Sequence, residues 1–125
     1  MPLLFACSDE PPPAPPEPAF VGSNACRDCH ESQYADWQGS HHDLAMQVAT
    51  PDTVLADFDA ATFRYFETET RFLSRDGEFF VATEGDDGAM QEYRIAYTFG
   101  VEPLQQYLVD TGNGRLQTLP FTWDT

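Results

Sequence analysis

The stretch EYRIAYTF, residues 92–99, decides the fold class for most of this 125-residue chain. Large apolar side chains alternate in it with polar or small ones. The large ones are Tyr93, Ile95, Tyr97 and Phe99. A period of two places successive side chains on opposite faces, so the pattern predicts a half-buried β-strand.

Hairpins are predicted on both sides of this strand. Residues 71–83 can fold about Asp76-Gly77, and residues 104–123 about residues 112–114, Gly-Asn-Gly. Such dipeptides favour the tight turns that join antiparallel strands. Pro103 and Pro120 are expected at a strand start and at a sheet edge. From Thr62 onward we therefore expect an antiparallel meander of four to five strands.

The preceding segment has a different period. From Cys26 to about Val48, several residues recur at spacings of three and four, which predicts one helical stripe. They are Cys26, Cys29, His30, Tyr34, Trp37, His41 and Leu44. Ser23 or Asn24 can cap its start, and Gly39-Ser40 is the expected break. Two short helices followed by a β meander predict an α+β fold, with a helical segment at 20–50 and a β region at 51–125.

The charge of the chain is one-sided. It carries 21 acidic residues against six basic ones, a net charge of −15, and all six basic residues are arginines. Nucleic acid is excluded as a partner, because binding it requires a basic surface. The acidic surface fits solubility, or docking of a basic partner protein.

The N-terminus predicts a membrane tether. Leu4-Phe5-Ala6-Cys7 is similar to a bacterial lipobox, in which the cysteine is lipidated, although a basic region and a longer apolar run are missing before it. We expect the true start upstream of Met1. Residues 9–18 hold six prolines and predict an extended spacer, so residues 1–19 are assigned as a tether. No stretch approaches the roughly 20 apolar residues of a membrane-spanning helix.

The chemistry is concentrated in Cys26, Cys29 and His30. On a helical turn, positions i, i+3 and i+4 share one face. Two thiols with this spacing can add to the two vinyl groups of a haem, while the adjacent imidazole binds the iron. This is the c-type haem attachment signature, Cys-x-x-Cys-His, and it predicts covalent haem c.

Three alternatives to haem remain open. A zinc site could use Cys26, Cys29 and His30 with His41 or His42, but neighbouring Cys29 and His30 are awkward joint ligands. A redox dithiol expects a preceding buried strand in a βαβ unit, which this sequence lacks. A structural disulfide is the third alternative.

The sequence also resembles a known family. Residues 20–23 and 26–30, followed by Tyr34, Trp37, Ser40, His42 and Met46, resemble the first haem segment of multihaem c-type cytochromes of the tetrahaem and hydroxylamine-oxidoreductase-like group. The closest likeness is to bacterial multihaem cytochromes with tetratricopeptide repeats. Residues 97–107 and 114–124 look like the β region of that group. Such proteins carry several Cys-x-x-Cys-His motifs and this chain has one, so we expect an N-terminal fragment of a longer protein; a complete single-haem protein is the alternative.

The later histidines lie far from His30 along the chain. A continuous helix would place His41 and His42 roughly 16–18 Å beyond His30, much farther than the two axial ligands of one iron. Only a sharp reversal at Gly39-Ser40, with the helix folded back over the porphyrin, could bring either to the same iron. The resemblance implies that His42 is the distal ligand of another haem, with His41 a weaker candidate. Met46 is expected as an apolar core residue of a helix rather than a ligand. Tyr34 and Trp37 would pack against the haem or against the β region.

These observations predict an exported c-type cytochrome segment. It would carry electrons by outer-sphere transfer to a redox partner protein or to further haem domains, in the periplasm or on the outer face of a membrane. The resemblance also leaves open a part of a multihaem oxidoreductase acting on small nitrogen or sulfur compounds. A non-haem, β-rich binding domain with a disulfide or zinc site is the remaining alternative.

Overall fold

The computed structural model describes residues 17–125, and this part of the chain is mostly β-structure. Two helices, α1 (Asn24–Arg27) and α2 (Glu31–Trp37), precede the strands. The strands are β1 (Met46–Val48), β2 (Asp59–Tyr65), β3 (Thr68–Arg75), β4 (Glu78–Glu84), β5 (Met90–Phe99), β6 (Leu104–Gly112), β7 (Arg115–Thr118) and β8 (Trp123–Asp124). The predicted α+β class is wrong, because only 10% of the structure is helical and the chain enters its first strand at Met46.

The strands form one antiparallel sheet of eight, more than the four to five predicted. Strands β2 to β7 follow one another in sequence order, while β1 pairs with β5 and β8 pairs with β6. Both predicted turns are present. Asp76 and Gly77 join β3 to β4, and Asn113 and Gly114 join β6 to β7, all four with positive φ. This backbone matches the twist of the flanking strands and is accessible to Gly, Asn and Asp.

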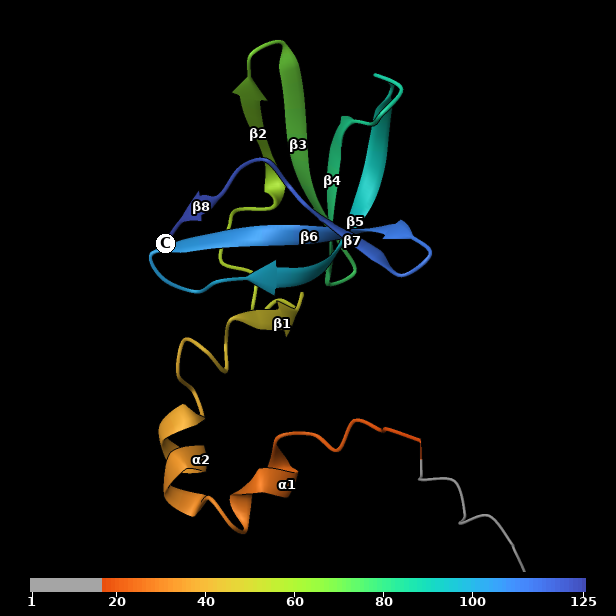
Figure 1. Cartoon of the computed structure of the whole chain (residues 1–125). Helices are drawn as coiled ribbons and strands as arrows, with labels where there is room; N and C mark the ends of the chain where they lie inside the picture. The colour runs from red at the N-terminus through yellow and green to blue at the C-terminus, as the bar shows by residue number, and fades with distance from the viewer. Residues whose placement is uncertain (1–16) are drawn as a thin grey trace, which may run out of the picture.

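Strand β5 connects two layers. Its first half pairs with β4 through Phe80↔Arg94, and its second half pairs with β6 and β1. A register shift between Ile95 and Tyr97 separates the halves. Figure 1 shows the result: β2, β3 and β4 stand upright, and β6 crosses them nearly at a right angle. The sheet is thus folded into two layers that pack face to face, which is the use of a bulge at a bend.

The bulge reverses which side of β5 is buried. Before it Ile95 is in the core, whereas after it Thr98 is 0% exposed and Phe99 is 46% exposed. The predicted alternation therefore holds only as far as Ile95. One extra residue moves every later side chain to the opposite face of the strand.

The core lies between the two layers. Its buried members are Phe58, Val81, Ile95, Tyr107, Val109 and Leu119. Phe58 is at the centre, with edge-to-face contacts to Phe72, Phe79 and Tyr107 at centroid separations of 5.1–5.2 Å. Such contacts stabilise aromatic clusters beyond the area that they bury.

A buried polar network fixes the segment between β1 and β2. Gln105 is 0% exposed, and its Oε1 accepts hydrogen bonds from the Leu55 amide (2.9 Å) and the Tyr107 hydroxyl (2.7 Å). Its Nε2 donates to the carbonyls of Thr53 and Gly100. Because the amide group is fully paired, burial of this glutamine is tolerated.

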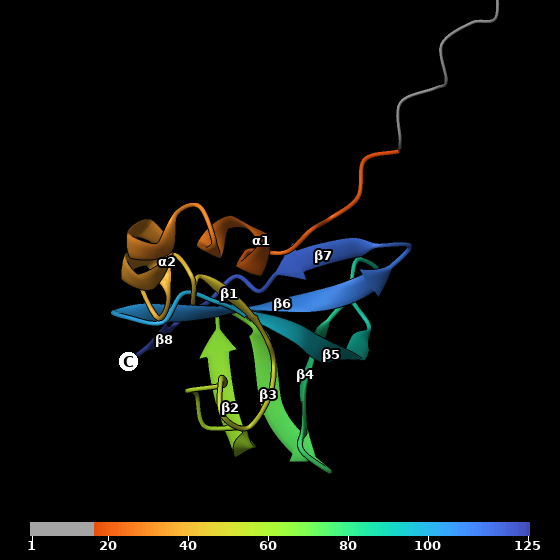
Figure 2. The ribbon, with the colours of Figure 1, turned by 90° about the horizontal axis from the view of Figure 1, so that it is seen from below.

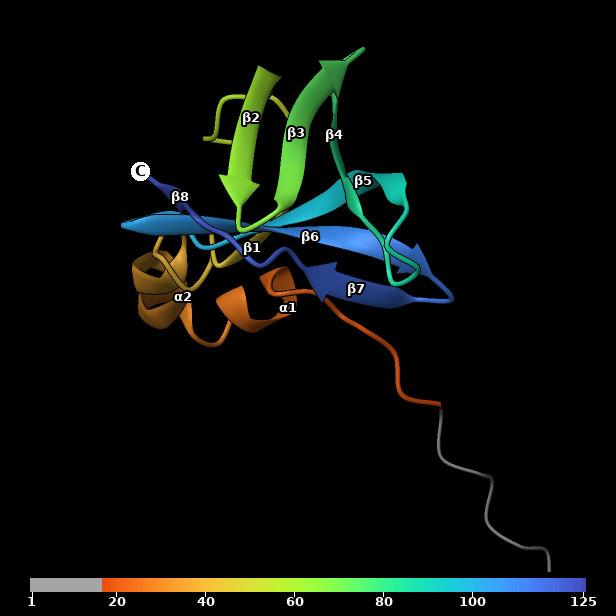
Figure 3. The ribbon, with the colours of Figure 1, turned by 90° about the horizontal axis from the view of Figure 1, so that it is seen from above.

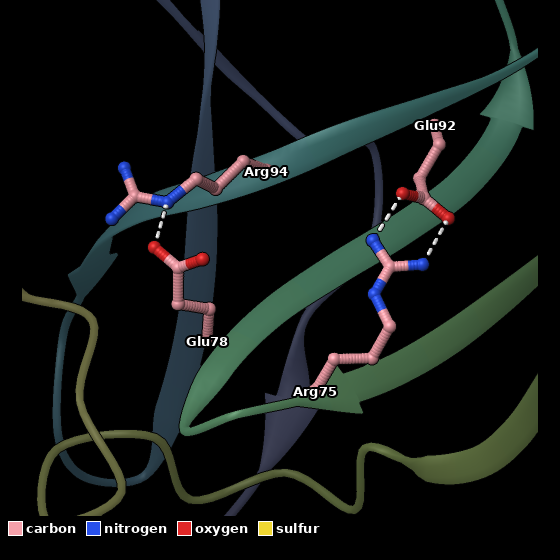
Figure 4. A network of polar contacts seen from close by, with 4 residues as sticks. All are labelled: Arg75, Glu78, Glu92 and Arg94. Atoms are coloured by element: carbon pink, nitrogen blue, oxygen red, sulfur yellow. Dashed lines mark hydrogen bonds and ion pairs between the residues drawn. The ribbon is translucent and has the colours of Figure 1, made fainter.

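The outer face of β3–β5 is charged. Arg75 donates a forked pair of hydrogen bonds to Glu92, and Arg94 Nε lies 2.8 Å from Glu78 Oε1 (Figure 4). The Arg75 guanidinium also lies 4.0 Å above the ring of Phe80. The hydrogen bonds from Arg75 lower the pKa of Glu92. Because its side chains are charged, this face of the sheet is exposed to solvent.

The helical segment differs from its prediction. The helix ends at Trp37, just before the predicted break at Gly39-Ser40, and a second break that was not predicted falls at Asp28–His30. Figures 2 and 3 show α1 and α2 on the side of the β5–β6 layer that is opposite β2–β4. Within residues 17–125 no helix has the length and apolar character needed to cross a membrane. Cys7 and most of the proline-rich spacer lie outside the described residues.

Candidate functional site

The Cys-x-x-Cys-His motif occupies the junction of the two helices. Cys26 is in α1, Cys29 is in the turn after it, and His30 is the residue before α2. The His30 amide donates to the Cys26 carbonyl at 3.0 Å, as in an α-helix, although the His30 backbone (φ −130°) leaves the helical region. The motif is thus one helical turn followed by a bend rather than part of a long helix.

Both thiols are available for reaction. Cys26 and Cys29 are free and exposed, and they are not joined to each other as a disulfide. His30 is exposed as well. Within residues 17–125, no three His, Cys, Asp or Glu side chains converge as a metal site. The ligands of the zinc alternative are therefore not brought together in the described part of the chain.

An apolar cavity adjoins the motif. It has a volume of about 290 Å³, and its wall is formed by Ser23, Cys26, His30, Gln33, Tyr34 and Trp37. The rings of Tyr34 and Trp37 lie 5.8 Å apart, centroid to centroid, and both residues are half-buried. One thiol and the imidazole of the motif thus border an aromatic surface, as the helical spacing predicted for these four residues.

A hydrogen bond joins α2 to α1 beside this cavity. The Tyr34 hydroxyl donates to Asn24 Oδ1 at 2.6 Å across ten residues. The sequence indicates Asn24 only as a helix cap and does not predict its link to Tyr34. The Cα atoms of the two helices lie within 8 Å of each other, and no strand Cα atom of the described structure lies within 8 Å of either helix. The packing of Tyr34 and Trp37 against the haem or against the β region stays a prediction.

The linker after α2 changes the argument about His41 and His42. Gly39, at φ +73°, ends the helix, and Asp43 Oδ2 accepts a hydrogen bond from its amide at 2.8 Å. Both histidines lie in the turns that follow and are exposed. Helix rise limits the reach of the two histidines only on a continuous helix. The chain breaks at Gly39, as predicted, so helix rise does not determine which iron either histidine could bind.

Met46 also differs from its prediction. It begins β1 instead of lying on a helix, and its side chain is 49% exposed rather than in the core. Its Cα partner on β5 is Phe99. Three residues are too few for an alternating pattern to show in the sequence, so this strand could not be found from periodicity.

The residues around the cavity fit a covalently held haem. They provide the Cys26 thiol, the His30 imidazole and aromatic walls of low polarity, and the second free thiol, Cys29, follows Cys26 at the attachment spacing. In such a site Cys26 and Cys29 would hold the porphyrin through thioether bonds, and His30 would bind the iron.

Comparison with known proteins supports this interpretation. A protein-family model described as cytochrome c554 and c-prime matches residues 25–67, about a third of the chain. The match begins one residue before Cys26 and supports a relationship to the c-type cytochromes. Searches of curated proteins and of solved structures gave no significant match.

Proposed function

We propose that this chain is a segment of an exported multihaem cytochrome that binds one haem c and carries electrons. The observation that carries the proposal is the helical turn at 26–30. Both of its thiols are free, and Cys26 and His30 border an apolar, aromatic cavity. The family match over the same segment supports it. Bound haem iron would supply a one-electron couple between the ferric and ferrous states.

Each residue of the site has its own role in holding the haem. Cys26 and Cys29 fix it covalently, so that the protein does not lose it when partners change. His30 donates a ring nitrogen to the iron, and the hydrogen bond of its backbone amide to Cys26 keeps the imidazole close to the thiols. Tyr34 and Trp37 shield one side from water, which favours the less charged ferrous state.

The expected partners follow from electron transfer. The chain passes electrons to a redox protein or to further haem domains, and His42 ligates a haem other than the one held by Cys26 and Cys29. The net charge of −15 favours a basic docking partner through electrostatic steering. Attachment of haem c takes place outside the cytoplasm, so we place the protein in the periplasm or at a membrane surface, tethered through Cys7.

The test is direct. The chain is expressed with a cytochrome c maturation system, denatured, and treated with alkaline pyridine. Haem-c absorption bands and a peroxidase-active band after denaturing electrophoresis are expected from the parent chain. The double variant Cys26→Ser/Cys29→Ser should lose both signals, whereas Asp28→Ser, which changes only an exposed spacer position of the motif, should keep them. Absence of haem-c bands in the parent chain contradicts the proposal.

A further inference from the structure

Three apolar side chains lie together on the outer face of the layer formed by β1, β5 and β6. They are Met46, Val48 and Phe99, and they are 49%, 59% and 46% exposed. Met46 pairs with Phe99, and Val48 pairs with Tyr97, so all three point to the same side. We call Met46, Val48 and Phe99 the β1–β5 patch.

The bulge in β5 creates this patch. Without the extra residue after Ile95, Phe99 would face the core and Thr98 would face outward. The outer face of β3–β5 instead carries Arg75 and Glu92 as an ion pair. Single exposed apolar residues are common, but a cross-strand cluster beside a charged face indicates a surface that another group covers.

The β1–β5 patch includes β1, the first strand that follows the candidate site in the sequence. Residues 38–45 connect α2 to β1 in hydrogen-bonded turns, with the Leu44 amide donating to the Ser40 carbonyl at 3.0 Å. The Gly100 amide donates to the Ala45 carbonyl at 2.8 Å, which fixes the end of this linker next to Phe99. The helices therefore lie beyond β1 in Figure 1 and toward the outer face of its layer in Figures 2 and 3.

Two apolar surfaces are thus left uncovered on one side of the molecule. The first is the cavity wall of Tyr34 and Trp37, which lie in a helix with no strand Cα atom within 8 Å in the described part of the chain. The second is the β1–β5 patch. The porphyrin of haem is a flat, largely apolar group, and the α1–α2 pair supplies only the wall that carries His30.

We propose that the β1–β5 patch is the second wall of the haem site and packs against the haem held by Cys26 and Cys29. This inference rests on the proposed function and adds the residues that cover the group on its other side. A second apolar wall excludes water from the iron, and so raises its reduction potential relative to a haem held by the helices alone.

Methionine oxidation tests the contact within one molecule. Met46 and Met90 are 49% and 54% exposed and both lie in strands, so they should react at similar rates when no haem is present. The protein is treated briefly with chloramine-T, and the two sulfoxides are quantified by mass spectrometry. The haem-loaded chain is compared with Cys26→Ser/Cys29→Ser, which cannot attach haem.

The expected result is a several-fold slower oxidation of Met46 than of Met90 in the haem-loaded chain, with nearly equal rates in the double variant. Equal rates in a chain whose haem content is confirmed by the pyridine assay would overturn the inference and leave the proposed function intact. Protection of Met46 in both forms would show that another surface, such as a second copy of the chain, covers the patch. A preparation without haem-c bands would overturn both proposals.

A second measurement uses the reduction potential. Phe99→Ser and the nearly isosteric Val48→Thr should each lower the midpoint potential of the haem. Leu116→Ser is the matched control, because Leu116 is also exposed (42%) but lies on β7, outside the patch. Circular dichroism checks that each variant is folded. Potentials that are the same in all four proteins would contradict the inference.

Discussion

The hydroxyl of Tyr34 donates a 2.6 Å hydrogen bond to Oδ1 of Asn24, and this bond joins α2 to α1 across the proposed haem site. No strand Cα atom of the described structure lies within 8 Å of either helix, so this bond and the backbone hydrogen bonds at the turn fix the position of α2 relative to α1. The relative position of Cys26 and His30 therefore depends on a contact between Asn24 and Tyr34, two residues outside the Cys-x-x-Cys-His motif.

Tyr34→Phe should loosen the motif without unfolding the sheet. Loss of one hydrogen bond of this kind costs about 1 kcal/mol, which corresponds to roughly fivefold faster hydrogen exchange of the helical amides. The His30 and Tyr34 amides, which donate to Cys26 and His30 carbonyls, are the reporters. Tyr65→Phe, at an exposed tyrosine of β2, serves as the control and should leave these rates unchanged.

Axial ligation separates the roles of the three histidines. In the haem-loaded chain, His30→Ala should keep the covalent haem but change its absorption and electron paramagnetic resonance spectra, because the iron loses its proximal ligand. His42→Ala and His41→Ala should leave both spectra unchanged when this chain is expressed alone. A spectral change in His42→Ala would show that His42 binds the same iron as His30.

Gln105→Leu should strongly destabilise the β region. The substitution leaves the Leu55 amide and the carbonyls of Thr53 and Gly100 without their side-chain partner. Each unpaired buried group costs about 1–3 kcal/mol, so we expect a loss of at least about 3 kcal/mol in the free energy of unfolding by urea. Gln106→Leu, at the next and less buried position, should change it by less than about 0.5 kcal/mol. Similar losses in the two variants would contradict the role given to Gln105.

Tyr107 should make the fold sensitive to alkaline pH. Burial raises the pKa of its hydroxyl above 10.0, and the hydroxyl donates to Gln105 Oε1 at 2.7 Å. A raised folded-state pKa gives a stabilising contribution that is complete below the unfolded-state pKa of about 10 and is lost as the pH rises through the folded-state value. Tyr107→Phe should be less stable at neutral pH and should lose less stability between pH 9 and pH 12. Parallel stability profiles for the parent and the variant would count against this titration.

The sequence predicted the strands with clear periodicity or strong turns. Residues 92–99 and the turns at Asp76-Gly77 and Asn113-Gly114 were found because local residue preferences decide them. The helical content was overestimated, since a spacing of three and four is equally consistent with a single turn, a bend and a second short helix. The register shift after Ile95 depends on pairing with β6, which no local pattern records.

The candidate site was predictable to the same extent. Cys26, Cys29 and His30 form a motif that is defined by spacing. Tyr34 and Trp37 follow at helical intervals and line the same cavity as Cys26 and His30. The role of His42 was implied by the family resemblance, and helix rise limits His41 and His42 only on a continuous helix, which Gly39 ends where the sequence predicted a break. Asn24, Met46 and Phe99 acquire their importance through contacts distant in sequence, so nothing in their immediate surroundings marks them.

The contacts described above differ in how far apart their partners lie in the sequence. This difference predicts the order in which the contacts form during folding. The turn at 26–30 and its link to Tyr34 form within a few residues, whereas the segment before β2 is fixed only when Gln105, 50 residues after Leu55, has arrived. Loops of that length close late, because their ends must first meet. If the chain is exported and loaded with haem as proposed, the two thiols would be accessible to the attaching enzymes before the sheet closes, and the sheet would then close around a cofactor that is already in place.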